Sequence, residues 1–326
     1  MTVRISVVVP TFKHPVLLER LLTALLAQDF PAAEYEIIIV DDAASAQTRT
    51  QVEERARQAT ESGHTVRYLP MTGVEHGPAA ARNAGWRAAS AEIIAFTDDD
   101  CIPEMSWLKA GLAAFTDGVA AVSGRVLVPL PPAPTDYEYN AAHLEKSEFV
   151  TANCFYRRSV LQTVGGFDAR FTAAWREDSD LFFTLLERGE SCISVPAAIV
   201  MHPVRPARWG ISLSQQRKSM YNALLYKKHP LLYRQRIQAR PPWPYYCIIG
   251  VLLVAVLSIF VHSWFLTAGA LLVWLYMTSR FCLLRLHKTA HTPGHIVEMI
   301  VTSMLIPPLA IFWRLYGMVR FRVLFL

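Results

Sequence analysis

The stretch IIAFTDDD at residues 93–100 is an apolar run that ends in a threonine and three aspartates. Two earlier runs, ISVVV at 5–9 and EIIIV at 36–40, are also short, mainly apolar and followed by a turn. Stretches with the apolar spacing of helices separate the runs, at 16–28, 47–61 and 79–88. Apolar strands that alternate with helices predict a mostly parallel sheet covered on both faces, an α/β fold of Rossmann type.

Ligands of such sheets bind at the carboxyl ends of the strands. The residues at these ends are Pro10, Thr11, Asp41, Asp42 and the aspartates at 98–100. No GxGxxG follows the first run, and no GxxxxGK[ST] occurs in the chain. These absences argue against a dinucleotide-dependent oxidoreductase and against a P-loop NTPase.

Asp98, Asp99 and Asp100 would repel one another in a crevice unless a divalent cation neutralised them. A hard metal ion that also binds phosphate oxygens is the expected partner. Taken alone, the three aspartates also fit a solvated turn before a helix near Pro103, and Asp42 also fits an ordinary turn at the end of a strand.

Charges are unevenly distributed along the chain. Residues 1–190 hold 17 Lys and Arg against 26 Asp and Glu, whereas residues 191–326 hold 15 basic residues and one acid, Glu298. The basic second part also contains 39 consecutive residues, 241–279, without Asp, Glu, Lys or Arg. Such a run is typical of a membrane segment and argues against a nucleic-acid-binding surface.

Two apolar stretches within and just beyond this run, 245–261 and 265–284, are each about long enough for one membrane crossing. Because only three residues join them, they predict a transmembrane hairpin; a buried pair of core helices is the alternative. A third apolar stretch, 300–319, contains Pro307, Pro308 and Arg314, and we expect it to be interfacial or re-entrant.

Basic residues flank the expected hairpin on both sides. Those before it are Arg205, Arg208, Arg217, Lys218, Lys227, Lys228, Arg234, Arg236 and Arg240, and those after it are Arg285 and Lys288. The positive-inside rule therefore predicts cytoplasmic flanks. Because the apolar run at 5–9 is too short for a signal peptide, we expect a multi-pass protein of the inner (cytoplasmic) membrane whose first 190 residues are cytoplasmic.

An ordered series of short motifs occupies the first two thirds of the chain. The motifs are VVVPTF at 7–12, VDDAAS at 40–45, GPAAARNAG at 77–85, DDD at 98–100, AN at 152–153, RR at 157–158, GGFD at 165–168 and WREDSDL at 175–181. Over about residues 3–205 this series resembles the family 2 glycosyltransferases. The resemblance implies a GT-A fold, a Rossmann-like nucleotide-binding domain, here followed by C-terminal transmembrane helices.

The resemblance also implies roles for the strand-end residues in binding a nucleotide diphosphate sugar. Thr11 and Asp42 match the residues that hold the nucleoside, with Asp42 facing uracil in a UDP-sugar. Arg82 matches an arginine that helps to bind base or phosphate, and Asp98 matches a carboxylate near the ribose. The same motifs add Pro10, Asp99 and Glu177 to the expected substrate-binding residues, and Gly166 and Phe167 to a loop below the sugar and the acceptor.

Asp100 matches the last aspartate of the family's DxD motif, which binds Mn²⁺ or Mg²⁺ at the diphosphate. His202 resembles the distal histidine that completes this metal site; a solvated histidine beside Pro203 is the alternative. The metal ion would offset the charge that develops on the departing nucleoside diphosphate.

Asp178 matches the carboxylate that deprotonates the acceptor hydroxyl, so that a single displacement inverts the anomeric configuration. An alternative interpretation is that Glu177, Asp178 and Asp180 only enrich the first turn of a helix at 178–187, where negative charge is favourable. Both interpretations are compatible.

The processive synthases of the family carry a QxxRW motif, but the sequence QQRKSMY at 215–221 lacks its tryptophan. We therefore expect transfer of one or a few sugars to a membrane-associated acceptor, such as a lipid-linked saccharide, in cell-envelope glycan synthesis. Two alternatives stay open: a polyprenyl-phosphate glycosyltransferase whose nucleophile is the lipid phosphate, and a non-catalytic membrane scaffold or nucleotide-sugar-binding subunit of a polysaccharide assembly.

The expected domains are a GT-A catalytic domain at 1–204, basic amphipathic or interfacial helices and a linker at 205–244, and a membrane region at 245–326. Within the first, the proline-rich segment 126–148 is a candidate mobile acceptor loop or a plain surface excursion. The sequence gives no indication of the oligomeric state.

Overall fold

The computed structural model describes residues 2–325. The chain forms two compact units, which are described separately. The first, here the sheet unit, contains the residues up to Pro129 and His143–Pro203. The second, here the helical unit, contains Leu130–Ala142 and the residues from Val204 onward. The short segment Leu130–Ala142 thus packs with residues that follow it by more than sixty positions. The segment itself lies outside the sequence range expected for the membrane region.

The sheet unit is built on one mixed sheet of eight strands. In spatial order these are β3 (Thr65–Pro70), β2 (Tyr35–Asp41), β1 (Ile5–Thr11), β4 (Ile93–Phe96), β7 (Cys154–Arg157), β6 (Val119–Leu127), β8 (Ser191–Met201) and β5 (Ile102–Pro103). β1 pairs in parallel with β2 and β4, and β2 pairs in parallel with β3. β7 is antiparallel to both β4 and β6. The predicted α/β fold is confirmed.

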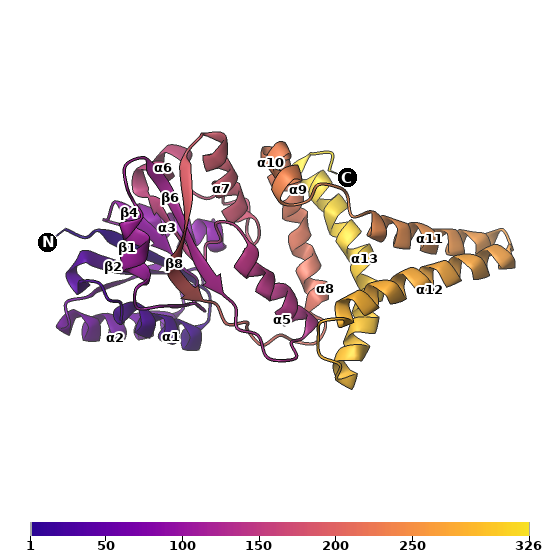
Figure 1. Ribbon diagram of the computed structural model, residues 1–326, viewed down its shortest axis with the longest axis horizontal. Helices are drawn as coiled ribbons and strands as arrows, with labels where there is room; N and C mark the ends of the chain where they lie inside the picture. The colour runs from indigo at the N-terminus through magenta and orange to yellow at the C-terminus, as the bar shows by residue number, and fades with distance from the viewer. Residues whose placement is uncertain (1, 326) are drawn as a thin grey trace. The chain divides into compact units, whose positions relative to one another are not determined.

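Successive residues of β2 and β4 are buried, so both faces of the central strands are covered. Helices α1 (Pro15–Leu26) and α2 (Ala46–Glu61) run along the same side of the unit (Figure 1). Helix α3 (Pro78–Ala88) packs against β1 and β2. A Cβ atom at Gly85 would clash with Val8 of β1, so the glycine permits this close packing.

Three further helices complete the sheet unit: α4 (Trp107–Ala113), α6 (Arg158–Val164) and α7 (Glu177–Glu187). Helix α7 begins one residue before the predicted start. Its first turn contains three acidic residues, Glu177, Asp178 and Asp180, where the helix dipole favours negative charge.

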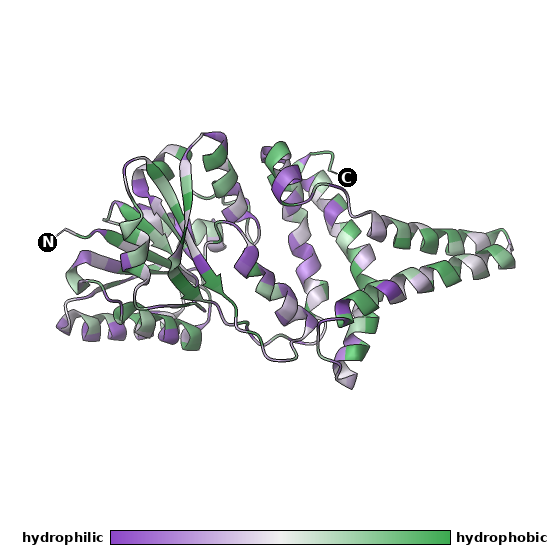
Figure 2. Cartoon of the chain, viewed as in Figure 1, coloured by the Kyte–Doolittle hydropathy of each residue, from purple (hydrophilic) through white to green (hydrophobic). Residues whose placement is uncertain are grey.

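The helical unit contains three long apolar helices. They are α11 (Trp243–Phe260), α12 (Trp264–Leu286) and α13 (Pro293–Phe321), and each is long and apolar enough to cross a membrane. Shorter helices of the unit are α5 (Asp136–Ala141), α8 (Ile211–Gln215), α9 (Met220–Lys228) and α10 (Pro230–Arg236). Figure 2 shows the outer parts of α11 and α12 as mainly hydrophobic.

Helices α11 and α12 pack against each other as the predicted hairpin. Near its turn, the buried hydroxyls of Ser258 and Thr267 are hydrogen-bonded at 2.7 Å, which satisfies two polar groups where no water is expected. The outward-facing side chains near the turn of this hairpin are apolar and exposed: Phe260 is 74 % and Phe265 is 97 % exposed. Exposed apolar side chains on this scale indicate membrane association.

The third apolar stretch forms part of one continuous helix of 29 residues, α13, with Pro307 and Pro308 in its interior. Prolines inside a helix usually kink or break it, yet α13 continues through both. A proline inside a helix leaves a backbone group without its hydrogen bond, and apolar helices tolerate this where they pack against neighbouring helices. Helix α13 packs against α9, α11 and α12. That residues 300–319 lie at the interface or re-enter the membrane stays a prediction.

Candidate active site

The carboxyl ends of β1 and β4 are joined by a buried hydrogen bond. The Thr11 hydroxyl donates to Oδ2 of Asp99 at 2.7 Å, and Nδ1 of His14 lies 3.1 Å from the same oxygen. Thr11 and Asp99 are 3 % and 4 % exposed. The middle aspartate of the series therefore binds the protein's own side chains and fixes the first turn of the site.

The two aspartates at the carboxyl end of β2 have different hydrogen-bond partners. Asp41 is fully buried and accepts hydrogen bonds from the backbone N–H groups of Ala43 and Ser45 and from the Tyr68 hydroxyl. Asp42 points elsewhere: Oδ2 accepts from the Gly77 N–H at 2.9 Å, and Oδ1 lies 2.8 Å from Nδ1 of His76. Asp42 therefore contacts the start of α3.

Arg82 of α3 bridges two carboxylates. Its guanidinium is 2 % exposed and donates to Oδ1 of Asp98 at 2.6 Å and to Oε1 of Glu177 at 3.0 Å. It also lies 5.8 Å from the ring centre of Phe167. Arg82 thus ties the end of β4 to the start of α7, and its predicted contact with base or phosphate stays a prediction.

The loop at Gly166 and Phe167 is fixed from below by Asn83. The Asn83 side chain donates to the Phe167 carbonyl at 2.7 Å and accepts from the Phe167 N–H at 2.9 Å and from Nε1 of Trp86 at 2.9 Å. Gly166 has φ +78°, and a Cβ there would lie 2.6 Å from Nε1 of Trp86 and clash with Oδ1 of Asn83. Only glycine fits this position without displacing the loop.

Two neighbouring carboxylates stand at the start of α7. Burial and the charge of Asp178 raise the pKa of Glu177 to about 7, despite the opposing charge of Arg82. Burial also raises the pKa of Asp178 above its ordinary value, against the hydrogen bond that its Oδ1 accepts from the Ser179 N–H at 2.6 Å. A carboxylate with a raised pKa is a stronger base than an ordinary aspartate, as proton abstraction requires.

Asp100 and His202 come together through the sheet. Ile102 of β5 pairs with Met201 of β8, so the residues beside this pair are neighbours. Nε2 of His202 lies 3.5 Å from Oδ1 of Asp100, and ligand atoms of Asp100, Cys101 and His202 lie within 4.8 Å of one another. Burial keeps the pKa of the Cys101 thiol well above its ordinary value, and a sulfur ligand is softer than Mn²⁺ and Mg²⁺ prefer. A carboxylate and an imidazole fit Mn²⁺ or Mg²⁺ as part of a ligand set.

Two family models match the sequence, Glycosyl transferase family 2 over residues 6–172 and Glycosyl transferase family group 2 over residues 93–313. The chain belongs to glycosyltransferase family 2. Among solved structures, mannosyltransferase PcManGT from Pyrobaculum calidifontis, in complex with GDP-Man and Mn²⁺, is similar with a TM-score of 0.62 over 97 % of this chain and 88 % of that one. At 20 % identity this likeness shows the shared fold.

Curated relatives of this glycosyltransferase have named activities of their own. Glycosyltransferase AglE of Haloferax volcanii is 28 % identical over 214 residues, which are 62 % of this chain and 67 % of AglE. GalNAc(5)-diNAcBac-PP-undecaprenol beta-1,3-glucosyltransferase of Campylobacter jejuni is 31 % identical over 125 residues, which are 38 % of each chain. This chain therefore spans only part of the length of these relatives.

Four residues of the candidate site are not among the site residues expected from the sequence. His14, His76, Asn83 and Asn153 each anchor a residue or strand of the site. Asn83 and Asn153 lie inside two of the sequence motifs, GPAAARNAG and AN, and this position was the signal that could have identified them. Asn153, fully buried, donates to the carbonyls of Arg125 and Ala198 and accepts from Trp107. No motif contained the two histidines.

Proposed function

We propose that this family 2 glycosyltransferase moves a sugar from a nucleotide diphosphate sugar to a hydroxyl group of a membrane-associated acceptor, with inversion at the anomeric carbon. The observation that carries the proposal is the start of α7, where Asp178, with its raised pKa, adjoins the bridge from Glu177 through Arg82 to Asp98. A base stands there beside the strand ends at which α/β sheets bind nucleotides.

Thr11, Asp42, Asp98 and Asp99 would line the nucleoside part of the donor site, with uracil as the proposed base facing Asp42. Asp100 and His202 would hold the divalent metal ion, which supplies charge neutralisation for the departing diphosphate. The network around Arg82 and Thr11 fixes these carboxylates in place before the donor arrives, and such preorganisation lowers the barrier of the chemical step.

In the transfer step, Asp178 accepts the proton of the acceptor hydroxyl. The hydroxyl oxygen then forms a bond to the anomeric carbon while the bond from that carbon to the diphosphate oxygen breaks, and the electron pair leaves with the nucleoside diphosphate. One displacement of this kind inverts the configuration. Gly166 and Phe167, held by Asn83, would form the surface under the sugar.

The acceptor is proposed to be a lipid or lipid-linked saccharide. Support comes from the three long apolar helices of the chain and from the Campylobacter relative, whose name specifies an undecaprenol-linked saccharide. With both flanks of the hairpin basic, the catalytic domain is proposed to lie on the cytoplasmic side. Protease access to the turn at 262–264 from that side would overturn this topology.

The test is the single-turnover rate at saturating donor for wild type and Asp178→Asn. Asparagine keeps the shape of the side chain but cannot take a proton, so we expect a rate loss of about 10² to 10⁴ with unchanged donor affinity. A loss below about tenfold would remove Asp178 from the mechanism. Such a result would favour a lipid phosphate as nucleophile, because a phosphate is already ionised near neutral pH and needs no base.

A further inference from the structure

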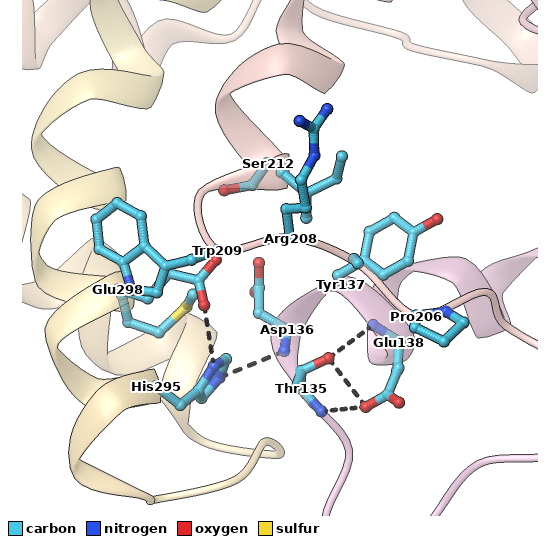
Figure 3. Close-up of a pocket in the computed structure, with 13 residues that line it drawn as sticks. Thr135, Asp136, Tyr137, Glu138, Pro206, Arg208, Trp209, Ser212, His295 and Glu298 are labelled. Atoms are coloured by element: carbon cyan, nitrogen blue, oxygen red, sulfur yellow. Dashed lines mark hydrogen bonds and ion pairs between the residues drawn. The ribbon is translucent and has the colours of Figure 1, made fainter.

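The helical unit contains a pocket with a volume of about 260 Å³, here called the polar pocket (Figure 3). Its walls come from three separate parts of the chain, the start of α5, the segment before α8 and the start of α13. The residues used below are Asp136, Tyr137, Arg208, Trp209, His295 and Glu298. The volume lies just under the roughly 300–1,000 Å³ of pockets for drug-sized ligands, so the pocket suits one small ring.

One wall of the polar pocket is held rigidly by an ion pair. Nη2 and Nε of Arg285 lie 2.7 Å and 3.3 Å from the two carboxylate oxygens of Asp136. Nη1 of Arg285 also donates to the hydroxyls of Thr302 and Ser303 at 2.7 Å and 2.9 Å. Because Arg285 and Asp136 are both nearly buried, this wall is neutral and preorganised.

The opposite wall contains Glu298, the sole acid among residues 191–326. Its Oε1 accepts a hydrogen bond from the Gly210 N–H at 2.7 Å, while its Oε2 lies 3.7 Å from Nδ1 of His295. His295 is 6 % exposed, and its Nε2 accepts from the Asp136 N–H at 3.3 Å. With Nε2 accepting, the ring carries its proton on Nδ1, which has no hydrogen-bond partner within residues 2–325. A buried donor without a partner indicates a place for a ligand oxygen.

The charge of the polar pocket disfavours an anionic ligand. Three carboxylates, Asp136, Glu138 and Glu298, line it together with a single guanidinium, that of Arg208. A phosphate group would meet more like charge than opposite charge. A metal ion is equally disfavoured, because within residues 2–325 the only group of three potential ligands with suitable spacing is that of Asp100, Cys101 and His202.

Two aromatic side chains of the polar pocket, Tyr137 and Trp209, lie on opposite sides of Asp136 in Figure 3. Trp209 is 57 % exposed, and its ring face is electron-rich. An aromatic face packs against the C–H groups of a sugar ring, while carboxylate oxygens and an imidazole N–H bind its hydroxyls. We propose that the polar pocket binds one neutral monosaccharide unit of the acceptor, which rests on the proposed transfer to a lipid-linked saccharide.

The test is saturation-transfer NMR on the full-length protein in lipid nanodiscs, with methyl glycosides of glucose, galactose, mannose and N-acetylglucosamine as probes. We expect at least one glycoside to bind wild type, and Trp209→Ala and Glu298→Gln each to lower its affinity about tenfold. Trp243→Ala is the matched control, because Trp243 is also 57 % exposed and belongs to the same unit outside the polar pocket. With a lipid-linked acceptor, the two pocket variants should raise the acceptor KM about tenfold and leave the donor KM unchanged.

Glycoside binding by both pocket variants as tight as that of wild type would overturn the inference, as would displacement of the glycoside by an equal concentration of methyl phosphate. Neither result tests whether Asp178 is the catalytic base. Failure of the proposed transfer step would instead appear as full turnover in Asp178→Asn, a variant whose polar pocket is unaltered. The two ideas therefore fail in different measurements.

Discussion

The two units hold their carboxylates in different electrostatic surroundings. In the sheet unit, Arg82 bridges Asp98 and Glu177, while Asp99 lies beside His14 and Asp100 beside His202. Asp178 adds a further acid next to Glu177. In the helical unit, Asp136 is matched by Arg285, and Glu298 by a backbone N–H and His295. A surplus of negative charge around strand ends suits a metal ion with a diphosphate, whereas carboxylates that already have partners in the protein suit a neutral ligand.

The largest effect should follow from removing the proposed metal ligand. We expect Asp100→Ala to lower the transfer rate by about 10³, equal to about 4 kcal/mol, because the charge on the leaving diphosphate is no longer offset. Asp29→Ala is the control, since Asp29 is an exposed acid of the same unit. Calorimetry with Mn²⁺ and a nucleoside diphosphate measures the binding. If Asp100→Ala bound the nucleoside diphosphate with Mn²⁺ as tightly as wild type, the metal ion would have to bind elsewhere. The proposed electrostatic difference between the units would then be wrong.

Arg82→Ala tests whether the acidic cluster needs its buried cation. The variant leaves Asp98 and Glu177 without their shared partner, and breaking a buried ion pair costs about 3–5 kcal/mol of unfolding free energy. Lys109→Ala should cost less than about 1 kcal/mol, because both Lys109 and its partner are exposed. Urea denaturation of the two variants measures the difference. Equal losses would show that the cluster is not held together by Arg82.

The sequence predicted the sheet unit well because its site residues stand at strand ends, in short local motifs. Asp98–Asp100 directly follow β4, and the apolar strands locate that edge. The contacts between these residues were not predictable in the same way. Arg82 and Glu177 are 95 residues apart in the chain, and only the packed structure shows that one guanidinium serves both Glu177 and Asp98.

The polar pocket could not be predicted at all. Its walls come from residues near 136, 209 and 298, none of which belongs to a recognisable motif. Segment Leu130–Ala142 packs with the helical unit, although its sequence resembles an ordinary proline-rich loop. The continuity of α13 through Pro307 and Pro308 was missed for a related reason, because packing against neighbouring helices overrides the local cost of proline.

A smaller effect should separate two adjacent glycines. Gly166→Ala should lower the unfolding free energy by about 2–3 kcal/mol, because it combines a positive φ with a clash against Asn83. Gly165→Ala should cost about 1 kcal/mol, because its φ is also positive but its Cβ would meet no atom within 4 Å. Thermal or urea unfolding of both variants gives the difference. Equal losses of unfolding free energy in the two variants would show that Asn83 does not hold the loop at Gly166 in place.

The smallest effect concerns pH. Burial and the charge of Asp178 raise the pKa of Glu177, and Glu177→Gln removes the carboxyl group that titrates. Glu177 contributes to stability. Its pKa is about 7 in the folded chain against an ordinary 4.5, so the folded state holds this proton more tightly. Its contribution is full below about pH 4.5 and is lost as the pH rises through about 7. Glu177→Gln should lack this loss, so urea unfolding at about pH 5 and pH 8 should show a smaller change in unfolding free energy for the variant than for wild type. Equal changes would show that Glu177 does not titrate with a raised pKa.

The acidic edge of the sheet unit is proposed to transfer a sugar to a membrane lipid. Mass spectrometry of lipids tests it most directly, after purified protein in nanodiscs of cellular lipid extract has been incubated with Mn²⁺ and a panel of nucleotide sugars. Wild type should convert one lipid species to a form heavier by one sugar residue, and Asp178→Asn should form about 10² to 10⁴ times less in the same time. Lipids that gain no sugar from any donor, or gain it equally with both proteins, would contradict the account.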